Sequence, residues 1–78
     1  MNNFVKIFGA KLKEHRKKQG FSQEAVAEKA GIHRTYVSAI ENGKTDLSLS
    51  IAEKVANALG KKLSDVIAEV EESSNQKT

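Results

Sequence analysis

The stretch from Ser22 to Gly43 most restricts how this chain can fold, because it predicts two short helices joined by a tight turn. Ser22 is a good N-cap residue for the first helix, and Gly31 is placed to end it. The second helix is expected from about His33 to Asn42, where Gly43 closes it. The flanking segments are predicted to form the scaffold that holds this second helix toward a partner.

Apolar residues at helical spacing predict three further helices around this pair. The first is expected from Phe4 to Gln19 and the last from about Asp65 to Glu71, with Ser64 as its cap. The fourth should begin after Ser48 and bury Leu49, Ala52, Val55, Ala56 and Leu59 on one face. No segment alternates as a strand would, so we expect an all-α domain of five helices over residues 1–71. Residues 72–78 lack apolar side chains, and we expect them to form a disordered tail.

The composition excludes several classes of protein. The 78 residues contain no Cys and only two His, so neither a disulfide framework nor a thiolate metal site is possible. No apolar run is long enough to span a membrane. No catalytic constellation or phosphate-binding glycine loop is present, and His15 and His33 lack metal-ligand spacing. We therefore expect a cytoplasmic protein that is not an enzyme and has no metal or cofactor.

The charge distribution favours a nucleic-acid partner. The first 44 residues carry nine Lys and Arg against four Glu, a net charge of +5, whereas the remainder has a net charge of −2. The outer face of the second short helix is small and polar, as major-groove readout requires. Arg34 could pair with a guanine, and the methyl group of Thr35 could contact a thymine. The candidate contacts with double-stranded DNA are Gln23, His33, Arg34, Thr35, Tyr36, Ser38, Ala39, Asn42 and Lys44.

Three segments, SQEAVAEKAGI, HRTYVSAIENG and SLSIAEKVANALG, resemble the Cro and phage-repressor type of helix-turn-helix family. This resemblance covers about residues 7 to 67. It implies a lambda-repressor-like DNA-binding domain that regulates transcription, and a structural ion pair between Arg16 and Glu41. Within the family, HRTYVSAIENG followed by SLS is most similar to the small controller proteins of restriction–modification systems. His15 stands where the family usually has an aliphatic residue, and we expect it to be partly buried and hydrogen-bonded.

The apolar face of the last helix predicts either a dimer interface or packing on the first helix. As a dimer interface it would comprise Leu63, Val66, Ile67 and Val70, and the homodimer would bind a roughly palindromic operator. Two other function classes stay open at this point. The chain could be a DNA-binding antitoxin or a regulator that acts through a protein partner, or it could be a structural helical module without a DNA role.

Overall fold

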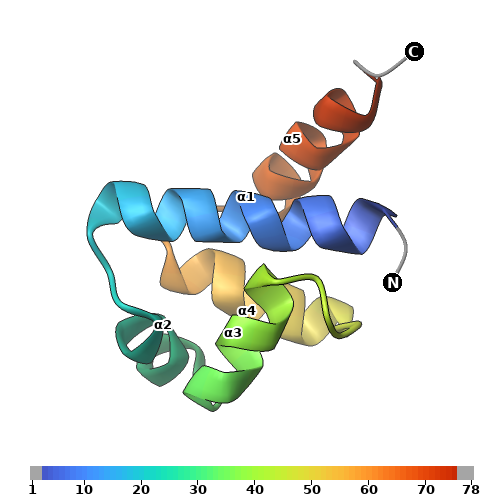
Figure 1. The fold of residues 1–78 in the computed structure, drawn as a ribbon. Helices are drawn as coiled ribbons and strands as arrows, with labels where there is room; N and C mark the ends of the chain where they lie inside the picture. Colours follow the sequence, from blue (N-terminus) through green and yellow to red (C-terminus); the bar gives the residue numbers. More distant parts are fainter. Residues whose placement is uncertain (1–2, 76–78) are drawn as a thin grey trace.

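A computed structural model describes residues 3–75 as five α-helices with no strand among them. They are α1 (Asn3–Gln19), α2 (Gln23–Ala30), α3 (Arg34–Glu41), α4 (Leu49–Ala58) and α5 (Leu63–Asn75). In Figure 1, α1 runs across the middle of the molecule, with α2, α3 and α4 on one side and α5 rising on the other. Helix α1 contacts both α3 and α5, while α4 contacts α2 and α5. The expected all-α fold of five helices is confirmed.

One apolar core holds the five helices together. Its largest fully buried side chains come from every helix: Leu12, Val26, Val37, Ile40, Val55, Val66 and Val70. Removing each such side chain from water contributes about 1.5–3 kcal/mol to folding. The short helices α2 and α3 therefore owe their stability to tertiary packing, because isolated helices of eight residues are not stable in water.

The end of α5 differs from the prediction. The helix begins at Leu63 and continues to Asn75, so the expected disordered tail is wrong for residues 72–75, while residues 76–78 lie outside the described residues. Glu is a good helix former, and extending an existing helix costs little compared with nucleating one. A lack of apolar side chains therefore did not prevent the helix from continuing.

Two predictions about single side chains have opposite outcomes. His15 is partly buried, as expected, and its Nε2 lies 2.9 Å from Glu69 Oε1, which joins α1 to α5. Leu49 was expected on the buried face of α4, but 75% of its surface is exposed. Leu49 is the first residue of α4. It is not part of the hydrophobic core, so helical periodicity alone misplaced it.

Candidate nucleic-acid interface

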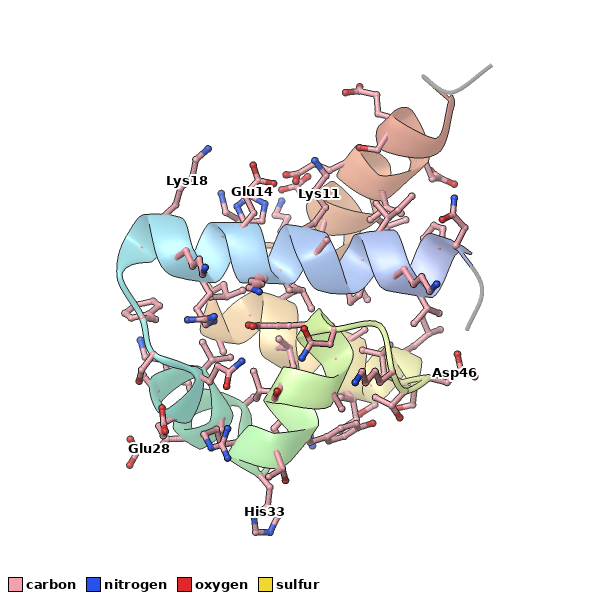
Figure 2. The ribbon with its side chains drawn as sticks, viewed as in Figure 1. Lys11, Glu14, Lys18, Glu28, His33 and Asp46 are labelled. Atoms are coloured by element: carbon pink, nitrogen blue, oxygen red, sulfur yellow. The ribbon has the colours of Figure 1, made fainter. Side chains whose placement is uncertain are left out.

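The turn between α2 and α3 is built by local capping. The Ser22 hydroxyl accepts a hydrogen bond of 3.0 Å from the backbone N–H of Ala25, which fixes the start of α2. Gly31 has φ of 73°, a left-handed conformation that few other residues adopt, and its N–H closes the end of α2. His33 occupies the N-cap position of α3, although its side chain makes no capping hydrogen bond. Figure 2 shows the His33 side chain pointing away from the body of the protein.

Helix α3 has one buried side and one outer side. Val37 and Ile40 are each 1% exposed and face the core. Of the candidate DNA contacts, His33, Arg34, Thr35, Asn42 and Lys44 are exposed, and Gln23, Tyr36, Ser38 and Ala39 are half-buried. No candidate on α3 is fully buried, although Tyr36 packs against the hydrophobic core. At the far end, Asn42 Nδ2 donates a 3.4 Å hydrogen bond to Ser38 Oγ.

The buried ion pair implied by the resemblance is present. Arg16 Nε donates to Glu41 Oε2 at 2.7 Å and Nη2 donates to Glu41 Oε1 at 3.1 Å, a bidentate pair between α1 and α3. A third bond joins Arg16 Nη1 to the Phe21 carbonyl oxygen at 2.9 Å. The hydrogen bond to Glu41 raises the pKa of Arg16 above its usual value, although burial opposes this. The guanidinium is therefore held in its charged form by Glu41.

Gln23 connects this buried pair to the outer face of α3. Its Nε2 donates to Glu41 Oε1 at 3.1 Å, and its Oε1 accepts from Arg34 Nη1 at 3.4 Å. A second acid also lies beside this arginine, since Glu24 Oε2 is 3.7 Å from Arg34 Nε. This contact of Glu24 was not predicted from the sequence. An acid at the start of α2 and an arginine at the start of α3 were the available signal, because the turn brings these two helix starts together.

The basic residues of α1 do not all join this face. In Figure 2, Lys11 and Lys18 point away from α1 on the side opposite to His33. Lys11 lies 3.7 Å from Glu14 on the same helix. These two lysines therefore lie apart from the polar surface formed by the outer side of α3 and the start of α2.

Three kinds of feature are absent from the described residues 3–75. No helix there is long and apolar enough to cross a membrane. No group of three or more His, Asp or Glu side chains in this range could hold a metal ion. Every buried side-chain nitrogen or oxygen among residues 3–73 has a hydrogen-bond partner, so no orphaned polar atom there points to a missing ligand.

Comparison with known proteins agrees with this geometry. Residues 12–66 match the helix-turn-helix family. The chain is 44% identical over 72 residues to the control protein C.MunI of a Mycoplasma species, covering 91% of this chain and 97% of that protein. It is 40% identical over 67 residues to the control protein C.BamHI of Bacillus amyloliquefaciens, covering 85% of this chain and 83% of that protein.

One solved structure is similar to this chain in both its fold and its amino-acid sequence. The restriction–modification controller protein C.AhdI from Aeromonas hydrophila superposes with a TM-score of 0.76 at 35% identity, covering 80% of this chain and 94% of that one. Other relatives are helix-turn-helix transcriptional regulators. The family match, the relatives that align over almost their full length and the α2–α3 geometry agree: the chain belongs to the helix-turn-helix family and is a DNA-binding regulator of transcription.

Proposed function

We propose that this protein is a controller of a restriction–modification system that binds a roughly palindromic operator as a homodimer, with α3 in the major groove. The similarity to C.MunI over 97% of that control protein supports the controller role. We further propose that the protein acts in the cytoplasm, where bacterial operators lie, and that it catalyses no reaction. Its relatives are regulators of transcription.

The outer side of α3 carries the proposal. Thr35 and Ser38 are short, so the helix backbone can come close to base edges, and Arg34 at the first turn is long enough for a bidentate pair with guanine. Lys44 lies just after α3, exposed, where it can meet a phosphate. Short polar residues flanked by cations are more typical of a surface that enters a DNA groove than of an ordinary solvent-exposed helix face.

Gln23 has a second proposed role beside the one predicted. Its amide nitrogen donates one of its two N–H groups to Glu41, and its carbonyl oxygen accepts from Arg34. That oxygen cannot donate to a phosphate. We propose that Gln23 positions Arg34, while the second N–H of its amide is left to donate to the DNA backbone.

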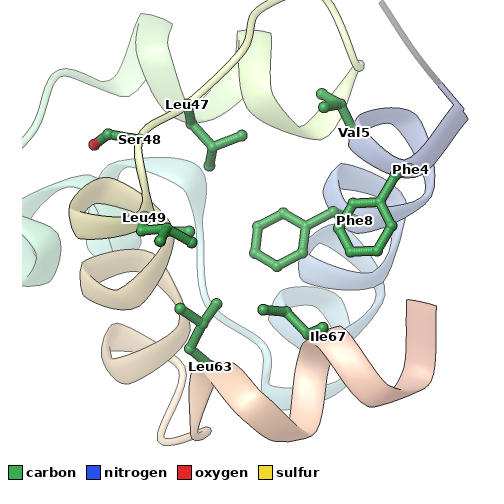
Figure 3. A pocket seen from close by; sticks show the side chains of 9 residues that line it. Phe4, Val5, Phe8, Leu47, Ser48, Leu49, Leu63 and Ile67 are labelled. Carbon is green, nitrogen blue, oxygen red and sulfur yellow. The ribbon is translucent and has the colours of Figure 1, made fainter. Parts of the chain in front are cut away.

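The residues that we propose for the dimer interface also differ from those predicted from the sequence. Val66 and Val70 are each 0% exposed within a single chain, so they belong to the core, which was the alternative to a dimer interface. Leu63 and Ile67 remain half-buried and line an open groove of about 120 Å³ between α1, α4 and α5. Figure 3 shows Phe4 and Leu49 beside them at this groove.

Phe4 and Leu49 are the large apolar residues that the described chain leaves exposed, at 39% and 75%. An exposed apolar surface next to a groove is typical of an interface. We therefore propose that Phe4, Leu49, Leu63 and Ile67 meet the same surface of a second copy. Two α3 helices related by this two-fold axis would enter successive major grooves about 34 Å apart.

Replacing Leu49 with Glu is expected to weaken the dimer at least about tenfold, because a charge would be desolvated where an apolar side chain was buried. Sedimentation velocity over a range of protein concentrations measures this shift. Ser50→Glu is the matched control, since Ser50 is the exposed neighbour on α4 but does not line the groove. Equal dissociation of both variants would place the interface elsewhere.

Selection of bound duplexes from random DNA tests the proposed function directly. A controller homodimer should select two half-sites related by a two-fold axis and spaced by about one helical turn. Selection of no sequence, or of a single half-site without symmetry, would contradict the proposal. A selected operator upstream of a methyltransferase or endonuclease gene would support the controller role over that of a general regulator.

Arg34→Ala is expected to cost about 1–3 kcal/mol on the selected operator and to relax base preference at one position of each half-site, because a bidentate base contact is lost. Lys44→Ala should instead weaken all duplexes by a similar factor and flatten the salt dependence, because it loses a phosphate contact. Titrations of operator and random duplexes at several salt concentrations distinguish the two. Equal loss on both duplexes for both variants would remove these roles.

A further inference from the structure

Arg34, the proposed base-reading residue, is held by two side chains of α2 before any DNA is bound. Its Nη1 donates to Gln23 Oε1 at 3.4 Å, and its Nε lies 3.7 Å from Glu24 Oε2. The guanidinium has five N–H donors. These two contacts leave other donors without a partner among the described residues. Enough donors therefore remain for a guanine edge while both α2 contacts persist.

The orientation of Gln23 is fixed by chemistry. A carboxylate can only accept hydrogen bonds, so Gln23 must present its amide nitrogen to Glu41. Glu41 is itself held by two hydrogen bonds from Arg16 and is only 3% exposed at its side chain. The Gln23 carbonyl is therefore directed toward Arg34 by a buried ion pair. Arg34 is supported on this side by a group that cannot easily rotate away.

Glu24 acts differently, because it carries a charge and is 72% exposed. An exposed ion pair of this kind contributes little to stability. The carboxylate of Glu24 instead affects whether Arg34 contacts a phosphate or a base on DNA. Non-specific binding depends on free cations that neutralise phosphates, whereas base readout depends on donors held in a fixed geometry. A carboxylate beside Arg34 lowers its attraction to phosphates and also repels them.

We propose, on the basis of the DNA-binding function proposed above, that Glu24 is a specificity-determining residue. It keeps Arg34 beside the Gln23 carbonyl, which reduces the cost of ordering Arg34 on a guanine. It also disfavours use of Arg34 as a phosphate contact on non-cognate DNA, which is discrimination by a repulsive element. Glu24 thereby raises the ratio of operator affinity to random-DNA affinity.

Glu24→Gln tests the proposal against Glu28→Gln, the matched control. Glu28 lies one turn further along α2, is exposed, and has no ion-pair partner among the described residues. Both changes remove one negative charge, so any effect of net charge is common to them. Dissociation constants on the selected operator and on a random duplex of equal length would be measured at several salt concentrations.

Glu24→Gln is expected to lower the operator-to-random ratio about two- to fivefold, the range that one exposed ion pair can supply. Glu28→Gln should change both affinities by one factor and leave the ratio unchanged. In an Arg34→Ala background the effect of Glu24→Gln on the ratio should disappear, since it acts through Arg34. Circular dichroism would verify that each variant is folded.

The outcomes separate this inference from the function on which it rests. If the wild-type protein prefers no duplex over random DNA, both the proposed function and the role of Glu24 are overturned. If the wild type discriminates but Glu24→Gln and Glu28→Gln give the same ratio, only the role of Glu24 is overturned. If Glu24→Gln still lowered the operator-to-random ratio in the Arg34→Ala background, Glu24 would not act through Arg34, and the proposed mechanism would be rejected.

Discussion

Replacing Arg16 with Met is expected to destabilise the protein by about 3–5 kcal/mol, because the Glu41 carboxylate would stay buried without its cation. Glu41 would keep only the hydrogen bond from Gln23. Met preserves much of the aliphatic stem of Arg16, so the loss reports the charge more than the packing. For a domain of 78 residues this is a large part of the total stability. Urea denaturation followed by circular dichroism measures the change.

Lys17→Met is the control, because it removes one positive charge from the next position of α1, where the side chain is exposed. It should change the free energy of unfolding by less than about 0.5 kcal/mol. The double variant Arg16→Met with Glu41→Leu should recover much of the lost stability, since replacing a whole buried pair is often neutral. A small loss for Arg16→Met alone would show that the pair is hydrated in solution.

The same double variant separates stability from DNA binding. Without Glu41, Gln23 loses the acceptor that holds its amide nitrogen and so directs its carbonyl oxygen toward Arg34. We expect the refolded double variant to bind the operator more weakly while its affinity for random DNA changes little. Full operator affinity in this variant would show that the buried pair serves only the fold.

Gly9→Ala is expected to destabilise the protein by about 2 kcal/mol or more, although Ala is the better helix former. A Cβ at position 9 would overlap the carbonyl oxygen of Ile40 and lie 3.0 Å from the carbonyl carbon. The obstacle is backbone, so α1 and α3 would have to move apart, and overpacking of this kind costs about 1–3 kcal/mol or more. We expect the overlap to exceed the gain of about 1 kcal/mol in helix propensity. The melting temperature should fall by roughly 10 °C.

Ala10→Gly supplies the control for helix propensity. Ala10 is the next residue of α1 and is exposed, so its replacement should cost about 0.5–1 kcal/mol through the backbone alone. If Gly9→Ala instead stabilised the protein by a similar amount, α1 and α3 would not approach each other as closely as the structure has them. Because α3 carries the proposed DNA contacts, Gly9→Ala should also weaken operator binding.

The sequence determined the elements whose signals are local. The Ser22 cap and the turn at Gly31 predicted the α2–α3 pair, and periodicity placed Val37 and Ile40 inside while Arg34 and Thr35 stayed outside. Capping bonds form between residues three or four apart, so their donors and acceptors can be found by inspection of the sequence. The Arg16–Glu41 pair followed only from the family resemblance, since nothing local connects two residues on different helices.

Only the tertiary structure decided which side of each helix is covered and by what. The apolar face of α5 proved to be two surfaces, with Val66 and Val70 in the core and Leu63 and Ile67 at an open groove. The exposure of Leu49 and the close contact at Gly9 also depend on how the helices pack in the tertiary structure. Periodicity identifies an apolar stripe, whereas the neighbours that bury it come from distant segments. The pairing of Glu24 with Arg34 likewise required the folded turn, because it depends on where two helices begin in space.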